Sequence, residues 1–585
     1  MTLILGINAF HADAAAAIVK DGTIIGAVEE ERFRRIKHWA GFPSESIRWC
    51  LREASVGINE IDHISINTQP KAHRLRRVFY SISTRANPAF LIRRWKNKQE
   101  RNNLREQLQQ AFPDTNIMAE LHFIEHHHAH LASAFYPSPF GDASIVSVDG
   151  FGDFASGAWG FGSGSGINID GHIFFPHSLG AFYTAITQFL GFPNYGDEYK
   201  VMGLAPYGSP KYIEQMNKLV KLNNDGSYSL DMKYFQHSGK KDLDHQWSHG
   251  TPVVGKHWDN QLEVLLGPAR VEGGPIQQHH MDIARSAQVM YENALYHLLD
   301  SVYSRNGCPN LCIAGGCGAN SVANGKISLR TKFKNVYVQA AAGDAGGALG
   351  SALEVWHRLY QKRCSPMNNA YLGYASSQQE IDSLLKTPSI LEELAIACCS
   401  VRKLDDNSIC EEVSDALTQG LVVGWFEGKM EWGPRALGHR SIIGDPRRAD
   451  MKDILNLKIK RRESFRPFAP SVLREAVYDW FETDGDVPFM MQVYSIREEK
   501  RQFIPAVTHV DGSGRLQTVT KEDNCRYYQL IQSFFQKTGV PMILNTSFNE
   551  NEPIVCSSKE ALNCFLRTKM DILVMENVII RRRDL

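Results

Sequence analysis

The sequence has no excess of charge of either sign. Its 585 residues include 64 Lys and Arg against 64 Asp and Glu, so the formal net charge is zero. Proteins whose main partner is nucleic acid or an anionic membrane surface usually carry a basic excess. The composition therefore favours neither partner. With 43% hydrophobic and 22% charged residues, it is that of a globular protein of roughly two to four domains.

Long hydrophobic runs and closely paired cysteines are also missing. No apolar run approaches the ~20 residues that a helix needs to cross a bilayer. The chain opens with MTLILGIN, a strand-like segment without a basic leader or cleavage site. The 11 cysteines are scattered and include no CxxC pair, which suits a reducing compartment better than a disulfide framework. We expect a cytoplasmic protein with no membrane partner.

A histidine cluster is the feature around which the rest of the chain is arranged. The motif HHHAHLASA occupies 126–134, and DGFGD follows at 149–153. His126 and His130 are four residues apart, so a helix places both imidazoles on one face, where one ion could bind them. The β-branched run 144–148 predicts a buried strand with Asp149 at its C-terminal end, where α/β proteins bind ligands. The alternative is a helix whose histidines pack in the core or face solvent.

Two later segments repeat the design of a strand followed by glycines. They read LCIAGGCGAN at 311–320 and AGDAGGALG at 342–350, the latter after a predicted strand at 335–339. In such turns, bare backbone N–H groups and a helix N-terminus accept phosphate. Gly316 is a candidate for this contact, and Asp344 adds a second strand-end carboxylate. Together with DGFGD, these turns predict a nucleotide held between two similar half-domains.

The N-terminal segment predicts strands at 3–7, 14–19 and 23–28 and a helix at 43–54. Its first turn carries His11 and Asp13, for which turn capping is the structural alternative. Residues 29–38, EEERFRRIKH, are either a solvated charged face or a basic wall over a phosphate. Residues 71–105 hold 11 Lys or Arg and one acidic residue, Glu100. Nucleic acid binding is one interpretation, but helical apolar spacing favours a solvated helical hairpin.

The final third of the chain is rich in cations. An irregular stretch at 361–366 predicts a domain boundary, and EWGPRALGHRS (431–441) and KRRESFRPFAP (460–470) follow it. So many cations among Gly and Pro would repel one another unless an anion neutralised them, and guanidinium groups suit phosphate or carboxylate. We interpret them as a polyphosphate site that includes Arg462 and Arg466. The alternative is a set of surface salt bridges with Glu427, Glu431 and Glu463.

Nine motifs, in one order, resemble those of the NodU/CmcH-type O-carbamoyltransferases of antibiotic, toxin and Nod-factor tailoring. They are HHHAHLASA, VDGFGD, EYKVMGLAPYG, GGCGANSVANGK, GDAGGALGSA, EWGPRALGHRS, KxRExFRPFAP, DGSGRLQTV and LNTSFN. The match runs nearly end to end. It implies an α/β fold, with an actin/sugar-kinase-like (ASKHA) domain of two similar halves at 1–360 and a YrdC-like, adenylate-forming α/β domain at 366–585.

The resemblance also implies a two-step reaction. ATP, with Mg²⁺, and carbamoyl phosphate would yield carbamoyl adenylate in the C-terminal domain. In the N-terminal domain, a divalent metal of the Fe²⁺ type would hold that adenylate while a hydroxyl of a small acceptor attacks the carbamoyl carbon. The family's metal ligands fall on His126, His130, Asp149 and Asp344. Its nucleotide contacts in the first domain fall on Lys37 and Asn320, and its adenylation contacts fall on Arg435, Lys460, Arg515 and Asn545.

The sequence departs from the family pattern at two places. The family's base falls on His11, but many relatives read His-Asp directly, whereas this chain has Ala12 between His11 and Asp13. The longer turn shifts the imidazole relative to the metal, so Asp13 is the alternative base. Asn551, where relatives often carry Gly, affects only the geometry of its own turn.

Two other functions are compatible with parts of the sequence. Transfer of a carbamoyl or threonylcarbamoyl group to tRNA or to a maturation protein rests on the basic segment 71–105 alone. A non-enzymatic, actin-like nucleotide switch needs one nucleotide pocket, so the second, cation-rich domain argues against it. We expect a small-molecule acceptor, bound by the loop-rich region 209–275 and the 71–105 hairpin.

Overall fold

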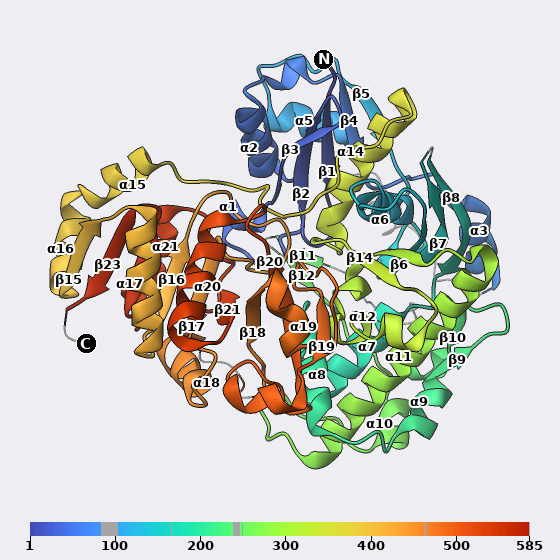
Figure 1. The fold of residues 1–585 in the computed structure, drawn as a ribbon. Helices are drawn as coiled ribbons and strands as arrows, with labels where there is room; N and C mark the ends of the chain where they lie inside the picture. Colours follow the sequence, from blue (N-terminus) through green and yellow to red (C-terminus); the bar gives the residue numbers. More distant parts are fainter. Residues whose placement is uncertain are drawn as a thin grey trace. The chain divides into compact units, whose positions relative to one another are not determined.

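The computed structural model describes residues 1–83, 103–164, 166–237, 246–248, 250–460, 463 and 465–583. It divides into two compact units, Met1–Met367 and Asn368–Leu585. In Figure 1 the first unit runs from blue to yellow and the second from yellow to red. Both units combine helices with mixed sheets, which confirms the predicted α/β class.

The first sheet of the N-terminal unit has five strands in the order β3-β2-β1-β4-β5. They are β1 (Leu3–Asn8), β2 (Ala15–Lys20), β3 (Thr23–Glu29), β4 (His63–Ile66) and β5 (Glu120–Phe123). The first three strands are antiparallel, whereas β4 and β5 run parallel to β1. The three N-terminal strands that the sequence predicts are therefore confirmed, as is the helix after them, α2 (Ser44–Ala54).

The second sheet repeats this arrangement in the order β8-β7-β6-β13-β14. Its strands are β6 (Ala143–Gly152), β7 (Ala155–Ser163), β8 (Gly166–Phe174), β13 (Asn310–Ala314) and β14 (Asn335–Val338). Again three antiparallel strands are followed by two parallel ones. The two sheets thus form the two similar halves of the predicted actin-like domain. One detail differs, because β6 continues past Asp149 to Gly152 through a register irregularity.

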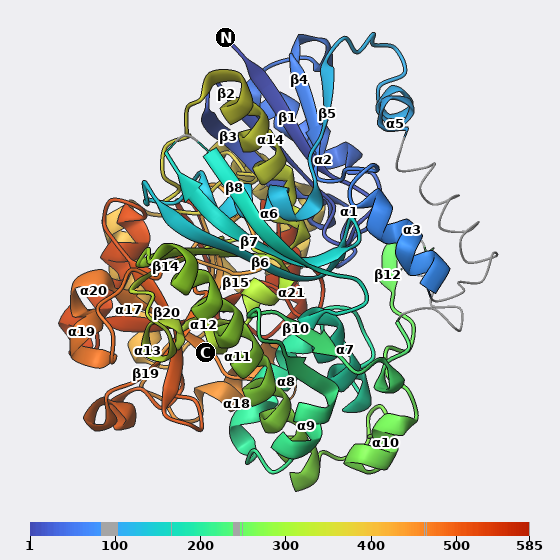
Figure 2. The same ribbon diagram turned by 90° about the vertical axis from the view of Figure 1, so that its right-hand side faces the viewer.

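Two helices, α6 (His126–Phe135) and α14 (Asp344–Tyr360), lie side by side between these sheets in Figures 1 and 2. Gly350 makes the close approach possible, since a Cβ there would lie 1.9 Å from the carbonyl oxygen of Ala129. At the C-terminal end of α6, the Arg363 guanidinium donates to the carbonyls of Phe135 and Tyr136, where a cation is favourable. These contacts fix the helix that carries the paired histidines.

The connections of the N-terminal unit are partly as predicted. The long helix α11 spans Gln278–Asn306. The region 209–275, expected to be irregular, contains short elements that include β9 (Val220–Leu222), β10 (Tyr228–Leu230) and α10 (Gln261–Leu266). Of the predicted basic hairpin, α3 (Arg74–Ser83) and the start of α5 (Leu104–Ala111) are described, whereas 84–102 lie outside the described residues.

The C-terminal unit is built on one mixed sheet of nine strands. In order these are β15 (Cys399–Lys403), β23 (Val578–Arg582), β22 (Ile572–Met575), β16 (Val423–Phe426), β17 (Arg440–Gly444), β21 (Met542–Ser547), β18 (Ala469–Leu473), β20 (Ser513–Val519) and β19 (Gln492–Ser495). Helices α20 (Cys525–Thr538) and α21 (Ser558–Arg567) pack on it, and α17 (Asp406–Thr418) packs on α20. Trp425, Phe426 and Tyr527 are fully buried in its core. The YrdC-like character of this unit stays a prediction.

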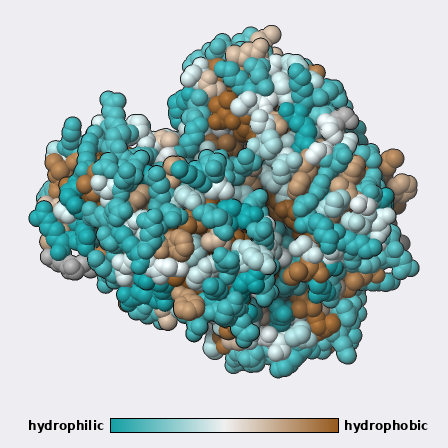
Figure 3. Space-filling view, viewed as in Figure 1, coloured by the Kyte–Doolittle hydropathy of each residue, from teal (hydrophilic) through white to brown (hydrophobic). Residues whose placement is uncertain are grey.

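The face drawn in Figure 3 is mainly hydrophilic, with apolar residues in small separate patches. Among the described residues, no helix is both long and apolar enough to cross a membrane. All 11 cysteines are unpaired.

Candidate active site

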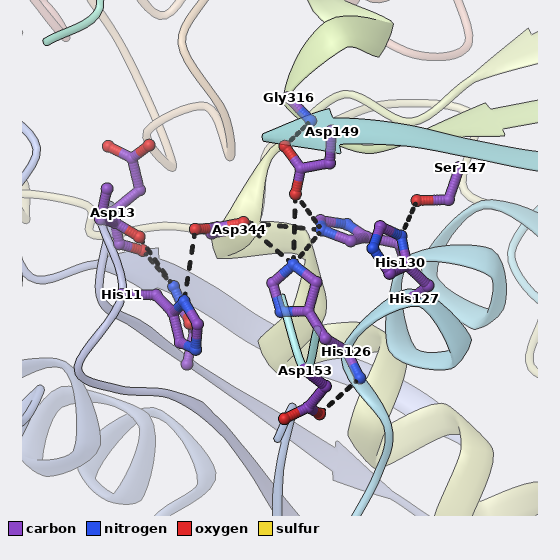
Figure 4. Close-up of polar contacts among 12 residues, drawn as sticks. His11, Asp13, His126, His127, His130, Ser147, Asp149, Asp153, Gly316 and Asp344 are labelled. Atoms are coloured by element: carbon purple, nitrogen blue, oxygen red, sulfur yellow. Dashed lines mark hydrogen bonds and ion pairs between the residues drawn. The ribbon is translucent and has the colours of Figure 1, made fainter. Parts of the chain in front are cut away.

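Four side chains from three segments converge on one point in the N-terminal unit (Figure 4). His126 and His130 direct their Nε2 atoms at each other, 3.1 Å apart, and each lies 3.2 Å from Oδ2 of Asp149. Oδ1 of Asp344, at the start of α14, lies 3.5 Å from both nitrogens. Both imidazoles are fully buried, whereas the carboxylates are 11% and 14% exposed. The cluster therefore opens to solvent on its carboxylate side.

The neighbouring histidines of the same run point elsewhere. The His127 ring contacts the Ser147 hydroxyl of β6 at 3.0 Å, and burial lowers its pKa to about 3. His128 faces the Glu354 carboxylate of α14 at 3.1 Å. Only the i, i+4 pair that helical geometry aligns reaches the cluster.

Two acidic residues outside the cluster position its helix. Glu125 caps α6, because its side chain accepts the His128 N–H. Asp153 accepts the N–H of His126 at 3.1 Å and also that of Gln69 at 2.7 Å. An N-terminal cap of this kind satisfies helix N–H groups that would otherwise lack partners. Neither role was predicted from the sequence, although Asp153 belongs to the DGFGD motif.

A backbone contact positions Asp149. Its Oδ1 accepts the Gly316 N–H at 2.9 Å, which leaves Oδ2 directed at the two imidazoles. A Cβ on Gly316 would lie 2.8 Å from the same Oδ1, so the glycine allows the close approach. The Gly316 N–H, predicted as a phosphate donor, is thus engaged by the carboxylate in this structure.

Without a cation, protonated imidazoles balance the negative charge of the cluster. Although burial opposes ionisation, hydrogen bonds from His126 and His130 keep the pKa of Asp149 well below its usual range. Burial and the negative charge of Asp149 raise the pKa of Asp344. Despite burial, the same two carboxylates raise the pKa of His130 to about 9. One divalent cation would neutralise both carboxylates and occupy the point on which the four donors converge.

The donor set fits such an ion. Imidazole nitrogens and carboxylate oxygens bind first-row divalent metals at about 2.0–2.2 Å, which places neighbouring ligand atoms roughly 3–3.5 Å apart. The separations of 3.1 to 3.5 Å between the donor atoms fall in this interval. Two imidazoles and two carboxylates suit iron as well as several other divalent ions.

The predicted base lies beside the cluster. The His11 ring centroid is 5.1 Å from that of His126, and its Nδ1 is 4.0 Å from Oδ2 of Asp344. Asp13, the alternative base, instead bonds His38 Nδ1 at 2.8 Å. Burial alone would lower the pKa of His38, but Asp13 and then Glu31 outweigh it and raise that pKa to about 9. Asp13 therefore forms an ion pair, and His11 is the group nearer the cluster.

The two nucleotide contacts implied for this unit have different surroundings. The Lys37 side chain is exposed. The Asn320 amide exchanges hydrogen bonds with the Gln288 amide, at 3.0 and 3.1 Å, and caps helix α12 (Ser321–Asn324) through the Ala323 N–H. Asn320 thus orders the turn after β13 through its own side chain.

In the C-terminal unit, the loop 431–440 carries Arg435 and is organised by one carboxylate. Oε1 of the buried Glu431 accepts the N–H groups of Leu437, His439 and Arg440 at 2.7, 2.8 and 3.1 Å. Arg435 Nε is buried without a hydrogen-bond partner among the described residues. Burial, and then the like charge of Arg466, lower the pKa of Arg435 to about 10. This guanidinium therefore lies where an anion would stabilise it.

The remaining predicted contacts of this unit fall in three environments. Asn545 joins the Arg435 loop, since its amide donates to the Ala436 carbonyl at 3.0 Å. Lys460 is buried, and its ammonium donates to oxygens of Ser547 and Asn549 at 2.6 to 3.3 Å. Arg515 lies in β20, and burial together with the positive charge of Arg515 lowers the pKa of His509. Arg462 lies outside the described residues.

Two of the three glutamates expected to form surface salt bridges with the cations have other partners. Glu463 lies 3.6 Å from Arg466, as the surface-pair interpretation has it. Glu431 instead accepts the backbone N–H groups already described, and Glu427 accepts the Trp425 indole N–H at 3.0 Å. The role of Glu431 has no signal in the sequence, because it depends on where the loop folds back.

Comparison with known proteins agrees with these two units. The family model described as carbamoyltransferase N-terminus matches residues 3–353, and that described as carbamoyltransferase C-terminus matches residues 414–582. The chain belongs to the carbamoyltransferase family. It is thus an enzyme that transfers a carbamoyl group from a donor to an acceptor, as the motif resemblance predicted.

Two relatives match nearly the whole chain. An uncharacterized protein of Synechocystis sp. is 42% identical, covering 100% of this chain and 97% of its own. Nodulation protein NolNO of Sinorhizobium fredii is 36% identical, covering 98% of this chain and 80% of its own. Among solved structures, HypF of T. kodakarensis aligns over 61% of this chain and 47% of its own, with 16% identity and a TM-score of 0.31.

Proposed function

We propose that this carbamoyltransferase is an ATP-dependent O-carbamoyltransferase that acts on a hydroxyl of a small natural product. The C-terminal unit would form carbamoyl adenylate, and the N-terminal unit would transfer the carbamoyl group. The observation that carries the proposal is the presence of two chemically different sites in one chain. One offers four converging metal donors, and the other offers the Arg435 guanidinium, whose buried Nε has no hydrogen-bond partner among the described residues.

The C-terminal site suits the activation step. Carbamoyl phosphate would lose its phosphate to water, and the resulting carbamate oxygen would attack the α-phosphorus of ATP, which carries Mg²⁺, and release pyrophosphate. Arg435 and Arg466 would bind the phosphate groups, because guanidinium–phosphate pairs strengthen where water is excluded. Glu431 would hold the Arg435 loop in place through its three backbone contacts.

The N-terminal cluster suits the transfer step. His126, His130, Asp149 and Asp344 would hold a divalent ion, which we propose to be Fe²⁺. Such an ion, when bound, supplies Lewis acidity and a fixed point for a phosphate group. The acceptor hydroxyl would attack the carbamoyl carbon, AMP would leave, and His11 would take the hydroxyl proton. The position of His11 beside Asp344 supports this role.

The test is incubation of the protein with ATP, Mg²⁺ and carbamoyl phosphate against a panel of hydroxylated metabolites. We expect release of phosphate and pyrophosphate and, for the right acceptor, a mass gain of one carbamoyl group. A protein that releases no pyrophosphate under these conditions would contradict the activation step.

Two variants separate the steps. His130→Asn should abolish transfer while pyrophosphate release persists, because only the N-terminal cluster loses a ligand. Arg435→Met should lower pyrophosphate release by about 100-fold, the order expected for loss of a buried charged contact to a phosphate. Arg448→Met is the matched control, since this arginine is 39% exposed and pairs with Asp450. Equal loss of both steps in His130→Asn would contradict the assignment of separate sites.

A further inference from the structure

A second group of metal-type donors lies on the first sheet of the N-terminal unit. His63 begins β4, and Glu120 and His122 lie on its parallel neighbour β5. The register pairs His63 with Glu120 and Ser65 with His122. Residues two apart on a strand point to the same side, so all three donors share one face of the sheet. Ser65 bonds Ser351 of α14 at 2.9 Å, which identifies that face as the one that α14 covers.

The donor atoms of this group are close together. His63 Nδ1 is 3.0 Å from His122 Nε2 and 3.6 Å from Oε2 of Glu120, and His122 Nε2 is 4.0 Å from Oε1 of Glu120. Ligands of one tetrahedral zinc ion lie roughly 3.3 Å apart, given bonds of about 2.0–2.2 Å. The pattern repeats that of the His126 cluster, in which two imidazole nitrogens 3.1 Å apart face carboxylate oxygens. A small adjustment of Glu120 alone would complete three ligand bonds.

The surroundings of the group suit a bound ion. The His63 and His122 side chains are only 16% and 18% exposed, whereas Glu120 is 68% exposed. The imidazoles are therefore held in place, while the carboxylate can close over an ion that enters from solvent, and water can fill the open coordination position. The nearby cation Arg358 is paired with Glu354.

We propose that His63, Glu120 and His122 form a second divalent-metal site, for zinc or a similar transition ion, that fastens the edge strand β5 to β4. The site is separate from the carbamoyl-transfer cluster, because its donors come from β4 and β5, whereas the donors of the cluster come from α6, β6 and the start of α14. Two imidazoles and one carboxylate are a donor set that zinc binds well. The bound ion would restrain the four-residue strand that leads into α6.

The test is metal stoichiometry of the full chain, expressed without a histidine tag and stripped with a chelator. After equilibration with Zn²⁺ and dialysis, His63→Ala and His122→Ala should each retain one equivalent fewer than the wild type. His130→Asn should lose a different equivalent, so that a His122→Ala/His130→Asn double variant loses two. His279→Ala is the control and should retain the wild-type content, since its imidazole belongs to none of the donor groups of the described residues.

Two further measurements keep the test decisive if a histidine variant folds poorly. Glu120→Ala, at an exposed carboxylate, should weaken binding of the second ion at least about tenfold with an unchanged melting temperature. Zn²⁺ should also slow amide exchange in β5 in the wild type and not in Glu120→Ala. The proposal is overturned if His63→Ala and His122→Ala bind as much zinc as the wild type, or if zinc leaves exchange in β5 unchanged.

Discussion

Gly152 lies directly against the imidazole of His126. A Cβ built on Gly152 would be 2.0 Å from both Cγ and Cδ2 of that ring, a separation that no pair of non-bonded carbon atoms adopts. The ring is fully buried, so it cannot swing out into solvent to make room. The second glycine of the DGFGD motif is therefore what lets His126 reach the cluster with His130 and Asp149.

Gly152→Ala should accordingly displace the His126 ring and lower the metal content of the N-terminal cluster. We expect loss of most carbamoyl transfer, because a catalytic group displaced by about 1 Å costs on the order of 100-fold in rate. Pyrophosphate release, assigned to the other unit, should persist. Metal analysis together with the two partial assays measures each effect.

Gly150→Ala is the matched control for this variant. It belongs to the same motif, two residues away, but a Cβ there would meet nothing within 4 Å. Metal content and transfer should therefore stay close to wild type. Similar losses in the two variants would mean that the motif needs glycine for backbone reasons and not for space beside His126.

How much of this site the sequence predicts depends on how far apart its parts lie in the chain. His126, His130 and Asp149 fall within one helix and the following strand, so spacing and strand pattern suffice. Asp344 comes from a distant segment, and only the family resemblance joined it to the other three. The pairing of Asp13 with His38 has no local signal, since it depends on how the first turn folds against the segment after β3.

The contacts of the glycine-rich turn and of the cation-rich loops also depend on segments that are far apart in the chain, so the sequence alone does not predict them. The pattern at 315–318 predicts exposed N–H groups, but only the folded sheet reveals that Asp149 accepts the Gly316 N–H. Likewise, charge counting places Lys460 and Arg435 in one anion site. Their hydrogen bonds distinguish them, because Lys460 donates to oxygens of Ser547 and Asn549 whereas Arg435 Nε has no hydrogen-bond partner among the described residues.

Lys460→Met should therefore act mainly on stability. The substitution removes the donor to three close oxygens at 2.6 to 2.7 Å, two of them carbonyls. Leaving buried acceptors unsatisfied costs about 2 kcal/mol or more, so we expect a lower midpoint of urea unfolding. Lys559→Met, at an exposed position of α21, should leave the midpoint unchanged. An unchanged midpoint in Lys460→Met, combined with loss of pyrophosphate release, would instead assign Lys460 a direct ligand contact.

Glu431→Gln should impair the activation step without removing any cation. The neutral amide oxygen accepts the three loop N–H groups less strongly than a carboxylate does, since charge-assisted hydrogen bonds are roughly twice as strong. The loop that carries Arg435 should loosen, and the KM for ATP should rise about tenfold or more. Metal binding in the N-terminal unit should be unaffected, and Glu393→Gln, at an exposed helix position, should change neither quantity. A KM equal to that of the wild type would show that Glu431 does not hold the loop.

Glu427 should make the stability of the protein depend on pH. Burial, only partly offset by Arg526, raises its pKa from 4.5 to about 7. The folded protein thus keeps a proton that the unfolded chain releases, so stability falls as the pH rises from about 4.5 to about 7 and is constant above that. The shift corresponds to at most about 3 kcal/mol.

Glu427→Gln keeps an oxygen that can accept the Trp425 indole N–H but has no charge to bury. Relative to the wild type it should therefore be more stable at pH 8 than at pH 5, as measured by urea unfolding followed by tryptophan fluorescence. Glu392→Gln, at an exposed carboxylate, controls for the loss of charge alone and should show no such pH-dependent gain. A difference between Glu427→Gln and the wild type that is the same at both pH values would mean that Glu427 ionises in the folded protein as readily as in the unfolded chain.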